Sequence, residues 1–384
     1  MNSVHGLCQL AWHRPRASNR RQRPIATPHR IAADMKRSSA APTTSVRFRF
    51  RLVPASEDAP SGRRHNGSAD ENSLQLGSES WDLVDLAAVE QDGARLLLLL
   101  QPSQQPPLTI TISISRINPS QLKHHLDVQR TRLRAERARA QLATPQQRAR
   151  FRQIICPACD VTVDLTPFPE TPQMLCPCCG TLVTIQSNLV PPENEADFRL
   201  CETCGMFSRP RNFRSFYFYY LVVHSGIHTH RSKRCRGCMR SASWKMLAGN
   251  SFFLVGVLPA LIQLTRAYRK ERDTGVYRGL ESANQWARRG KLTKAIEGYH
   301  EILQRVPCAA GIYYNLGMAL YKQHDLAHAV SVLELALNDC ANYTPAFQLL
   351  EQCYRQSGDV EKLETLQSHW QLPSGATSTS QVGP

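Results

Sequence analysis

The sequence predicts a multidomain protein in which a small β unit and two cysteine-rich modules precede an all-α array of helical hairpins. Three patterns predict this order. Apolar residues alternate with polar ones over 45–115, cysteines recur in C-x2-C pairs between 151 and 240, and a 34-residue period runs over 276–369. A chain of 384 residues exceeds what one core usually organises, so several folded units are expected.

The net charge of +16 is concentrated in two segments. Residues 1–64 hold thirteen Lys or Arg against three Asp or Glu, and residues 116–152 hold ten against two. Residues 1–44 contain few large apolar side chains, so we expect a disordered basic tail there and a second disordered tail over 370–384. No apolar run follows the first basic residues, so a secretory signal is not expected. A transit peptide, or a translation start at Met35, stays open.

Strand-like alternation marks the β unit at 45–115. In SVRFRFRLV, apolar residues alternate with Arg47, Arg49 and Arg51, and LTITISIS near residue 110 repeats the pattern. The preceding RLLLLL is typical of a fully buried strand. Residues 61–80, rich in Gly, Ser and Asn, are expected to form a loop. The three arginines are expected on a solvated strand face, with a binding face as the alternative.

A basic segment follows at 116–150. We expect a helix that begins at an N-cap Ser120 and stops near Pro145. Its leucines form only a narrow apolar stripe, so the prediction is a solvated linker helix. Contact with nucleic acid or an acidic partner through 116–152 is the alternative.

Two C-x2-C pairs predict a metal site within 151–190. The four ligands are Cys156, Cys159, Cys176 and Cys179, with sixteen residues between the pairs. This spacing is typical of a zinc ribbon, in which two knuckle turns place four thiolates around one ion. Cys178 lies inside the second knuckle and is expected to be a bystander. Disulfides and a redox dithiol are the alternatives.

A second module is predicted at 198–240. Its expected ligands are Cys201, Cys204, Cys235 and Cys238. The insert contains an aromatic run that predicts a buried strand, followed by three histidines that could replace a cysteine or bind another ion, namely His224, His228 and His230. The spacing also resembles rubredoxin, which implies iron as an alternative metal, although CRGCM lacks the usual CPxCG.

The predicted cofactors are therefore two zinc ions in zinc ribbon-type modules. Four thiolates leave no open coordination position, which argues against catalysis. The sequence also lacks a P-loop, an HExxH helix, a G-x-S-x-G elbow and a dinucleotide fingerprint, so no enzyme is predicted.

An apolar segment connects the modules to the helical array over 241–275. Residues 246–264 are nineteen uncharged residues, which is near the lower limit for a membrane span. Polar residues and Pro259 dilute the run, so a buried connecting helix that begins at Pro259 is expected. The side chains expected to pack together there are Leu261, Leu264, Tyr268, Trp244 and Tyr277. A membrane-tethered form is the alternative.

The last third of the chain repeats every 34 residues. The aligned positions are Gly290, His324 and Gly358, then Ala295, Ala329 and Leu363, then Tyr313 and Phe347, and Leu316 and Leu350. The stretch IYYNLGMALYKQHDLAHAVSVLELAL closely resembles a tetratricopeptide repeat, and ANQWARRGKLTKAIEGYHEILQRVP is similar over its second helix. The resemblance covers 276–369, and the last repeat departs from the pattern because Leu363 replaces a small residue. Cys308, Cys340 and Cys353 are expected to be packing residues.

The tetratricopeptide resemblance implies a groove, lined by the first helix of each repeat, that binds a peptide or helix. The residues it implies for the groove are Tyr314, Met318, Tyr321, Lys322, Gln348 and Gln352. The sequence therefore predicts a cytoplasmic, non-catalytic, zinc-binding scaffold for protein–protein interaction. The alternatives are a nucleic-acid-binding regulator that uses the ribbon and basic helix, a redox or enzyme-accessory protein, and a membrane-tethered scaffold.

Overall fold

The structure is a computed structural model of the chain. It describes residues 45–53, 63–102, 106–142, 144–221, 224–250, 254–269, 275–306 and 308–369. All of these belong to one structural unit that begins at Thr44. The tails predicted at 1–44 and 370–384 lie outside the described residues.

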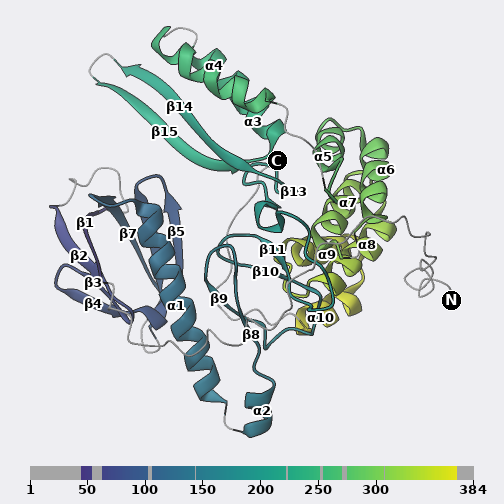
Figure 1. Cartoon of the computed structure of the whole chain (residues 1–384), viewed down its shortest axis with the longest axis horizontal. Helices are drawn as coiled ribbons and strands as arrows, with labels where there is room; N and C mark the ends of the chain where they lie inside the picture. Colours follow the sequence, from purple (N-terminus) through teal and green to yellow (C-terminus); the bar gives the residue numbers. More distant parts are fainter. Residues whose placement is uncertain are drawn as a thin grey trace, which may run out of the picture. The chain divides into compact units, whose positions relative to one another are not determined.

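Seven strands form one antiparallel sheet at the predicted β unit, in the order β4-β3-β2-β1-β7-β6-β5 (Figure 1). The strands are β1 (Val46–Leu52), β2 (His65–Ala69), β3 (Ser73–Leu76), β4 (Glu79–Asp82), β5 (Leu86–Asp92), β6 (Arg95–Leu100) and β7 (Leu108–Ser115). A short 3-10 turn, η2 (Leu83–Asp85), joins β4 to β5. Alternate side chains of β1 and β6, such as Phe50 and Leu98, are buried. The period-2 pattern therefore identified the core face of β1. The prediction that RLLLLL is fully buried is wrong, because β6 also alternates and its Leu97 is 37% exposed.

The loop predicted at 61–80 is wrong, because β2, β3 and β4 lie there. The Gly, Ser and Asn residues do make turns, but the turns are tight and the strands between them short. Asp70 accepts hydrogen bonds from the backbone N–H groups of Asn72 and Ser73, and Gly77 adopts a φ of 67°. A turn-rich composition here indicates frequent turns rather than one long loop.

Helix α1 (Pro119–Gln141) packs on this sheet, so the prediction of a solvated linker is also wrong. Leu122 and Leu126 are fully buried with the sheet residues. The helix is capped by the side chain of Asn118 rather than by Ser120. Pro145 opens a second short helix, α2 (Pro145–Ala149), beyond the end of α1.

The basic face of α1 is largely engaged with the sheet. Arg130 donates to the carbonyl of Ala87 (2.9 Å), and Arg134 donates to the carbonyl of Val84 (3.0 Å). Arg137 forms an ion pair with Asp85 at 3.6 Å. These cations therefore hold the helix in place.

Three small hairpins and one long hairpin follow. They pair β8 (Gln153–Ile155) with β9 (Thr162–Asp164), β10 (Gln173–Leu175) with β11 (Leu182–Thr184), β12 (Arg199–Leu200) with β13 (Phe207–Ser208), and β14 (Arg211–Leu221) with β15 (His224–Arg234). A 3-10 turn, η3 (Glu195–Asp197), precedes β12. The aromatic insert of the second module thus forms the long β14–β15 hairpin.

The apolar connection forms two helices, α3 (Arg236–Asn250) and α4 (Leu254–Tyr268), which pack on each other and on β14. This differs from the expected buried helix. Pro259 lies inside α4, and Leu261, Tyr268 and Trp244 are exposed. Tyr277 instead belongs to the core of the following helices. Among the described residues, no helix has both the length and the apolar character that crossing a membrane requires.

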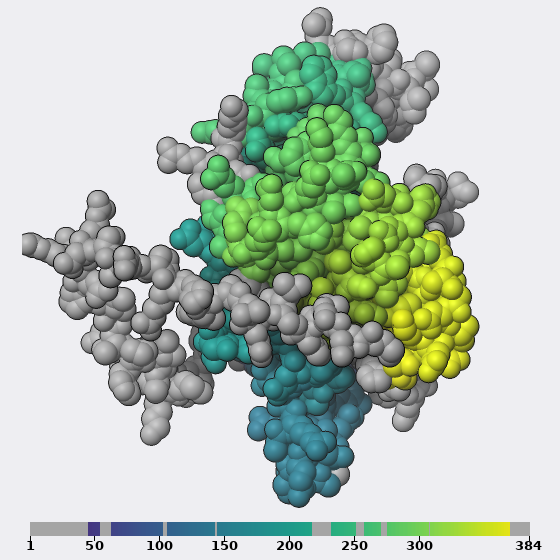
Figure 2. Space-filling view, turned by 90° about the vertical axis from the view of Figure 1, so that its right-hand side faces the viewer, coloured from purple at the N-terminus to yellow at the C-terminus, as the bar shows by residue number. Residues whose placement is uncertain are grey.

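Six further helices form three consecutive helical hairpins, drawn in green to yellow in Figure 2. They are α5 (Leu280–Arg288), α6 (Leu292–Leu303), α7 (Ala310–Lys322), α8 (Leu326–Asp339), α9 (Thr344–Ser357) and α10 (Val360–His369). The aligned Gly290, His324 and Gly358 separate the two helices of each hairpin, and all three have a positive φ, of 74°, 64° and 72°. The 34-residue period therefore marks one recurring left-handed turn.

Candidate metal centres

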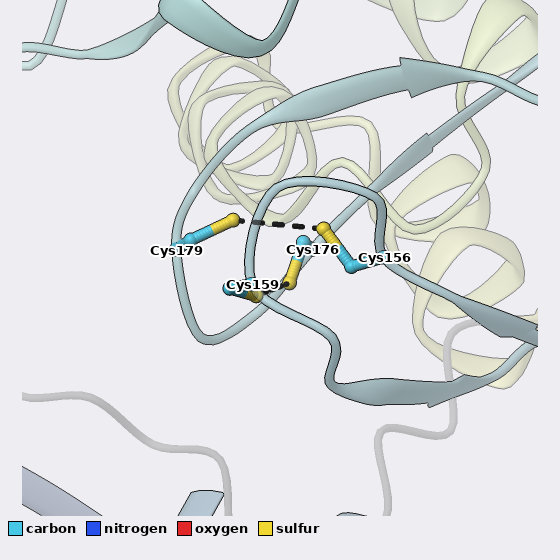
Figure 3. A group of neighbouring side chains, drawn as sticks. All are labelled: Cys156, Cys159, Cys176 and Cys179. Atoms are coloured by element: carbon cyan, nitrogen blue, oxygen red, sulfur yellow. Dashed lines mark hydrogen bonds between the residues drawn. The ribbon is translucent and has the colours of Figure 1, made fainter. Parts of the chain in front are cut away.

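The first candidate metal centre lies between two small hairpins. Its four thiols converge on one point, as Figure 3 shows. The residues are Cys156, Cys159, Cys176 and Cys179, and Cys156 and Cys176 are fully buried. The Sγ atoms of Cys156 and Cys179 lie 3.7 Å apart, and those of Cys159 and Cys176 lie 3.5 Å apart.

The second candidate centre has the same composition. Its residues are Cys201, Cys204, Cys235 and Cys238. The Sγ atoms of Cys204 and Cys235 lie 3.8 Å apart, and the backbone N–H of Cys235 donates to Cys201 Sγ at 3.3 Å. In each centre all four sulfurs lie within 4.8 Å of one another.

These distances fit a tetrahedral thiolate site. Zinc–sulfur bonds of about 2.3 Å at tetrahedral angles would separate neighbouring sulfurs by about 3.8 Å. The observed separations are close to that value and well beyond the length of a disulfide. All eight predicted ligands are thus free thiols gathered in two groups of four.

Three of the four C-x2-C turns share one backbone geometry. A residue with positive φ follows the second cysteine in each, and these residues are Asp160, Gly180 and Gly205. Each donates its N–H to the carbonyl of the first cysteine of its turn. The first cysteine in turn donates its own N–H across the hairpin, as Cys176 does to Thr181. The hairpins therefore fix the direction of each thiol.

The Cys235–Cys238 turn is different because it opens helix α3. The N–H of Met239 donates to the carbonyl of Cys235, as in a first helical turn. A helix N-terminus favours negative charge, so this position stabilises thiolates without the positive-φ residue of the other three turns. This geometry explains why CRGCM departs from the CPxCG pattern.

An arginine from the helical array completes the second centre. Arg288, in α5, donates through Nη1 to Cys235 Sγ at 2.9 Å and to Cys238 Sγ at 3.4 Å. Burial opposes its charge, but the thiolates of Cys235 and Cys238 outweigh that effect and raise the pKa of the guanidinium. Gly237 makes room for this contact, because a Cβ there would lie 1.5 Å from Arg288 Nη2. Four thiolates around a divalent ion would leave a net negative charge, which Arg288 would partly balance.

The other cysteines that the structure describes lie outside the two groups. Burial raises the pKa of Cys178 to about 11, and Arg130 donates to its sulfur at 3.5 Å, which is consistent with the expected bystander role. Cys340 and Cys353 are buried in the helical core, and Cys308 is half-buried. The side chains of His224, His228 and His230 lie outside the described part of the structure.

Buried asparagines join the second metal module to the helices. Asn315, in α7, accepts a hydrogen bond from the N–H of Phe207 (2.8 Å) and donates to the carbonyl of the same residue (2.8 Å). Asn284, in α5, donates to that carbonyl as well (2.9 Å). A carboxamide carries one acceptor and two donors, so it can pair with both backbone groups of a residue as a neighbouring strand would. Strand β13 is thereby held by side chains in place of a further strand.

The first metal module is held in the same way. Asn342, just before α9, accepts from the N–H of Leu175 and donates to its carbonyl, both at 2.8 Å. Gln173 adds a contact, because its Oε1 accepts from the N–H of Ala310 at 3.1 Å. Apolar side chains from both modules, including Phe207 and Leu182, belong to the core of the helical hairpins. The two modules and the helices thus share one core.

This arrangement changes the role of the residues expected in an open groove. Tyr314 packs edge-on against Tyr343, with ring centroids 5.6 Å apart, and its hydroxyl lies beside Gly205 of the second module. Burial raises the pKa of Tyr314 to about 12. Met318 and Tyr321 pack partly on the helical core. Lys322, Gln348 and Gln352 are exposed.

The sequence analysis found all eight thiols of the two groups but missed the residues that hold the modules on the helices. These are Arg288, Asn284, Asn315 and Asn342. The sequence carries one hint, since Asn284 and Asn315 occupy helical positions among apolar residues, where a polar side chain needs a partner. No protein-family model and no curated protein matches the chain.

Proposed function

We propose that the chain is a non-catalytic scaffold that binds two zinc ions and uses a tetratricopeptide array for protein–protein interaction. The observation that carries the proposal is a pair of closed four-thiol groups docked on repeated helical hairpins. Four thiolates complete the coordination of a zinc ion and leave no position for water or a substrate. The metal would then stabilise the two modules rather than activate a reactant.

The tetratricopeptide assignment is supported by the geometry of the repeat. The second helices begin at Leu292, Leu326 and Val360, which are 34 residues apart. Ala295 and Ala329, small residues in the motif, are fully buried where the paired helices approach. Stacked hairpins of this kind curve and present a continuous surface to a partner.

The metal modules occupy part of the surface that such arrays offer to peptides. Asn284 and Asn315 already bind the backbone of β13, so a partner would use the part beyond them. We assign the partner-binding part of the surface to Tyr321, Lys322, Gln348 and Gln352. Nucleic-acid binding through 116–152 is less well supported, because α1 uses arginines to hold the sheet.

Metal analysis of the purified chain tests the zinc assignment. We expect two zinc ions per chain, one ion after Cys156→Ser with Cys159→Ser, and one ion after Cys201→Ser with Cys204→Ser. Cys178→Ser is the matched control and should retain two ions, since its thiol lies outside both groups. Fewer than one ion in the unmodified chain would refute the assignment, and iron in place of zinc would correct the metal.

The scaffold role is tested by affinity capture of partners followed by mass spectrometry. Lys322→Glu with Gln352→Glu should abolish capture of a specific partner while leaving the zinc content and helicity unchanged. Ser331→Glu with Asn338→Glu places two charges on exposed positions of α8 and serves as the control. If the two double variants capture the partner equally well, the assigned surface does not bind it.

A further inference from the structure

Helices α3 and α4 present a second surface, which is apolar and exposed and contains no ligand thiol. Twelve large apolar side chains are exposed in the described chain, and five of them lie on α3 and α4. They are Trp244 (54% exposed), Leu258 (67%), Leu261 (41%), Ile262 (50%) and Tyr268 (49%). We call these five residues the α3–α4 apolar surface.

Helix α4 is oriented with its large apolar residues outward. Ala260 and Ala267 are buried against Phe213 and Met246, whereas Leu258, Leu261 and Ile262 face solvent. A helix of a water-soluble core normally buries its bulky apolar stripe and exposes the opposite face. This inverted pattern indicates that the outward stripe contacts something other than water.

The two aromatic residues at the edge of this surface are held in place. Trp244 donates through Nε1 to the hydroxyl of Tyr268 at 3.2 Å. The guanidinium of Arg240 lies over the Tyr268 ring, 4.6 Å from its centroid. Paired Trp and Tyr side chains beside cations are typical of the boundary between lipid and water, where an apolar ring body and a polar tip are both satisfied.

The surrounding segment carries positive charge alone. Residues 203–270 contain twelve Lys or Arg and no Asp or Glu. Lys245, Arg266 and Arg269 are exposed on α3 and at the end of α4. An apolar helix face with a basic rim is the physical signature of a helix that lies in the surface of an anionic membrane.

Other occupants fit this surface less well. A second copy of the chain would bring two segments of the same positive charge together, with no carboxylate in either to balance them. A nucleic acid would pair with the arginines but would leave the stripe of Leu258, Leu261 and Ile262 in water. Anionic lipid satisfies both the apolar stripe and the cations.

We propose that the α3–α4 apolar surface binds the headgroup region of an anionic lipid membrane, with Leu258, Leu261 and Ile262 inserted among the acyl chains and Arg266 and Arg269 at the headgroups. The contact is peripheral, since α4 would lie along the membrane plane. It does not depend on the scaffold role proposed above, because it uses neither the thiol groups nor the helical hairpins.

Vesicle flotation of the intact, metal-loaded chain tests the proposal. Vesicles of phosphatidylcholine with about 30% phosphatidylserine should carry the protein, and pure phosphatidylcholine should carry far less. Leu258→Gln with Leu261→Gln and Ile262→Gln should weaken binding on the order of 100-fold, because three apolar side chains no longer leave water. Arg266→Gln with Arg269→Gln should weaken it roughly 10- to 30-fold, and high salt should act in the same direction.

Leu335→Gln with Val360→Gln is the matched control, because both residues are exposed but lie on α8 and α10. This variant should bind vesicles as the unmodified chain does. A blue shift of Trp244 emission with vesicles, absent after Trp244→Phe, would place the ring in lipid. The circular dichroism and metal content of every variant should equal those of the unmodified chain, so that a loss of binding is not a loss of folding.

Three results would overturn the proposal. The first is equal vesicle binding by the unmodified chain and the triple glutamine variant. The second is binding to polyuridylate without binding to vesicles, which would assign the surface to nucleic acid. The third is self-association, or binding to an acidic protein, that the triple variant loses while the unmodified chain ignores vesicles.

Discussion

Replacing Asn315 with alanine should separate the second metal module from the helices more than any other single change. The side chain of Asn315 is fully buried and makes three hydrogen bonds. Two pair with the backbone of Phe207, and the third goes to Asn284 Oδ1 at 3.0 Å. Phe207 itself is only 2% exposed, so water cannot easily replace the amide.

The loss of stability caused by Asn315→Ala follows from the hydrogen bonds that each partner group loses or keeps. The carbonyl of Phe207 keeps a donor, because Asn284 also bonds to it, and Asn284 Oδ1 keeps the hydroxyl of Tyr299 at 2.8 Å. The N–H of Phe207 loses its bond to Asn315. A buried donor left unsatisfied costs about 1–3 kcal/mol. With about 1 kcal/mol for the space left by the truncated side chain, we expect a loss of roughly 2–4 kcal/mol.

Hydrogen exchange is the appropriate assay, because a chain with several separate hydrophobic cores has no single free energy of unfolding. Asn315→Ala should raise exchange of the amides around Phe207 and in the flanking β12–β13 hairpin, while the β1–β7 sheet stays protected. Asn342→Ala should have a smaller effect, because Asn342 is only half-buried whereas Asn315 is fully buried. Asn212→Ala, at an exposed position of β14, is the control and should change nothing.

A loss of stability below about 0.5 kcal/mol for Asn315→Ala would contradict this role of Asn315, since a buried donor without a partner cannot cost so little. An increase in exchange that is spread evenly over the chain would refute it as well. Zinc content should remain unchanged in all three variants, because none of these asparagines bonds to a thiol of either four-cysteine group; the thiol that bonds to Asn342 is that of Cys340, which lies outside both groups. Loss of metal would mean that the module folds only when docked.

Three further predictions concern the contacts of the metal modules and the helices. Gly237→Ala forces Arg288 away from Cys235 and Cys238, so zinc transfer from the second centre to a chromogenic chelator should quicken about tenfold, with the first centre unchanged. Burial raises the pKa of Asp339 to about 6 from an ordinary 3.8, so the folded state holds this proton more tightly and stability falls as pH rises between those values. Asp339→Asn should therefore stabilise the folded state by about 2 kcal/mol at pH 7, seen as a higher melting temperature, and should have no such effect at pH 4. Full chelation should increase exchange in α5 and α7 as well as in the modules, whereas exchange confined to 151–240 would contradict the shared core.

The sequence predicted the thiol groups well because ligands and turns are local properties. A C-x2-C pair places two sulfurs on one turn whatever surrounds it, and the residues with positive φ, Asp160, Gly180 and Gly205, follow directly in the chain. The 34-residue period was equally readable, since Gly290, His324 and Gly358 each make the turn within their own hairpin.

The predictions that were wrong for α1 and α4 concern which face of a helix packs against another element. Helix α1 looked solvated because its leucines are few, yet two of them, Leu122 and Leu126, are fully buried in the core of the sheet. Helix α4 is apolar on both faces, so periodicity could not say which face would be buried. Its alanines face inward and Leu261 outward, the reverse of the expected packing. The face that becomes buried depends on the surface that the helix packs against, and the sequence of the helix alone does not determine that surface.

The docking contacts explain why the two metal modules and the helical array occur in one chain. Each module contains a small hairpin with backbone N–H and carbonyl groups that no neighbouring strand pairs. These groups, on Leu175 and Phe207, would face water if the module stood alone. Asparagines of the helices bond those groups, and Arg288 adds a positive charge beside the thiols of the second centre. Neither part can make these contacts by itself. The turns of these hairpins hold the thiols in place, and the β12–β13 hairpin bonds to Asn284 and Asn315. A metal bound at either centre would therefore stabilise a surface that extends well beyond its four ligands.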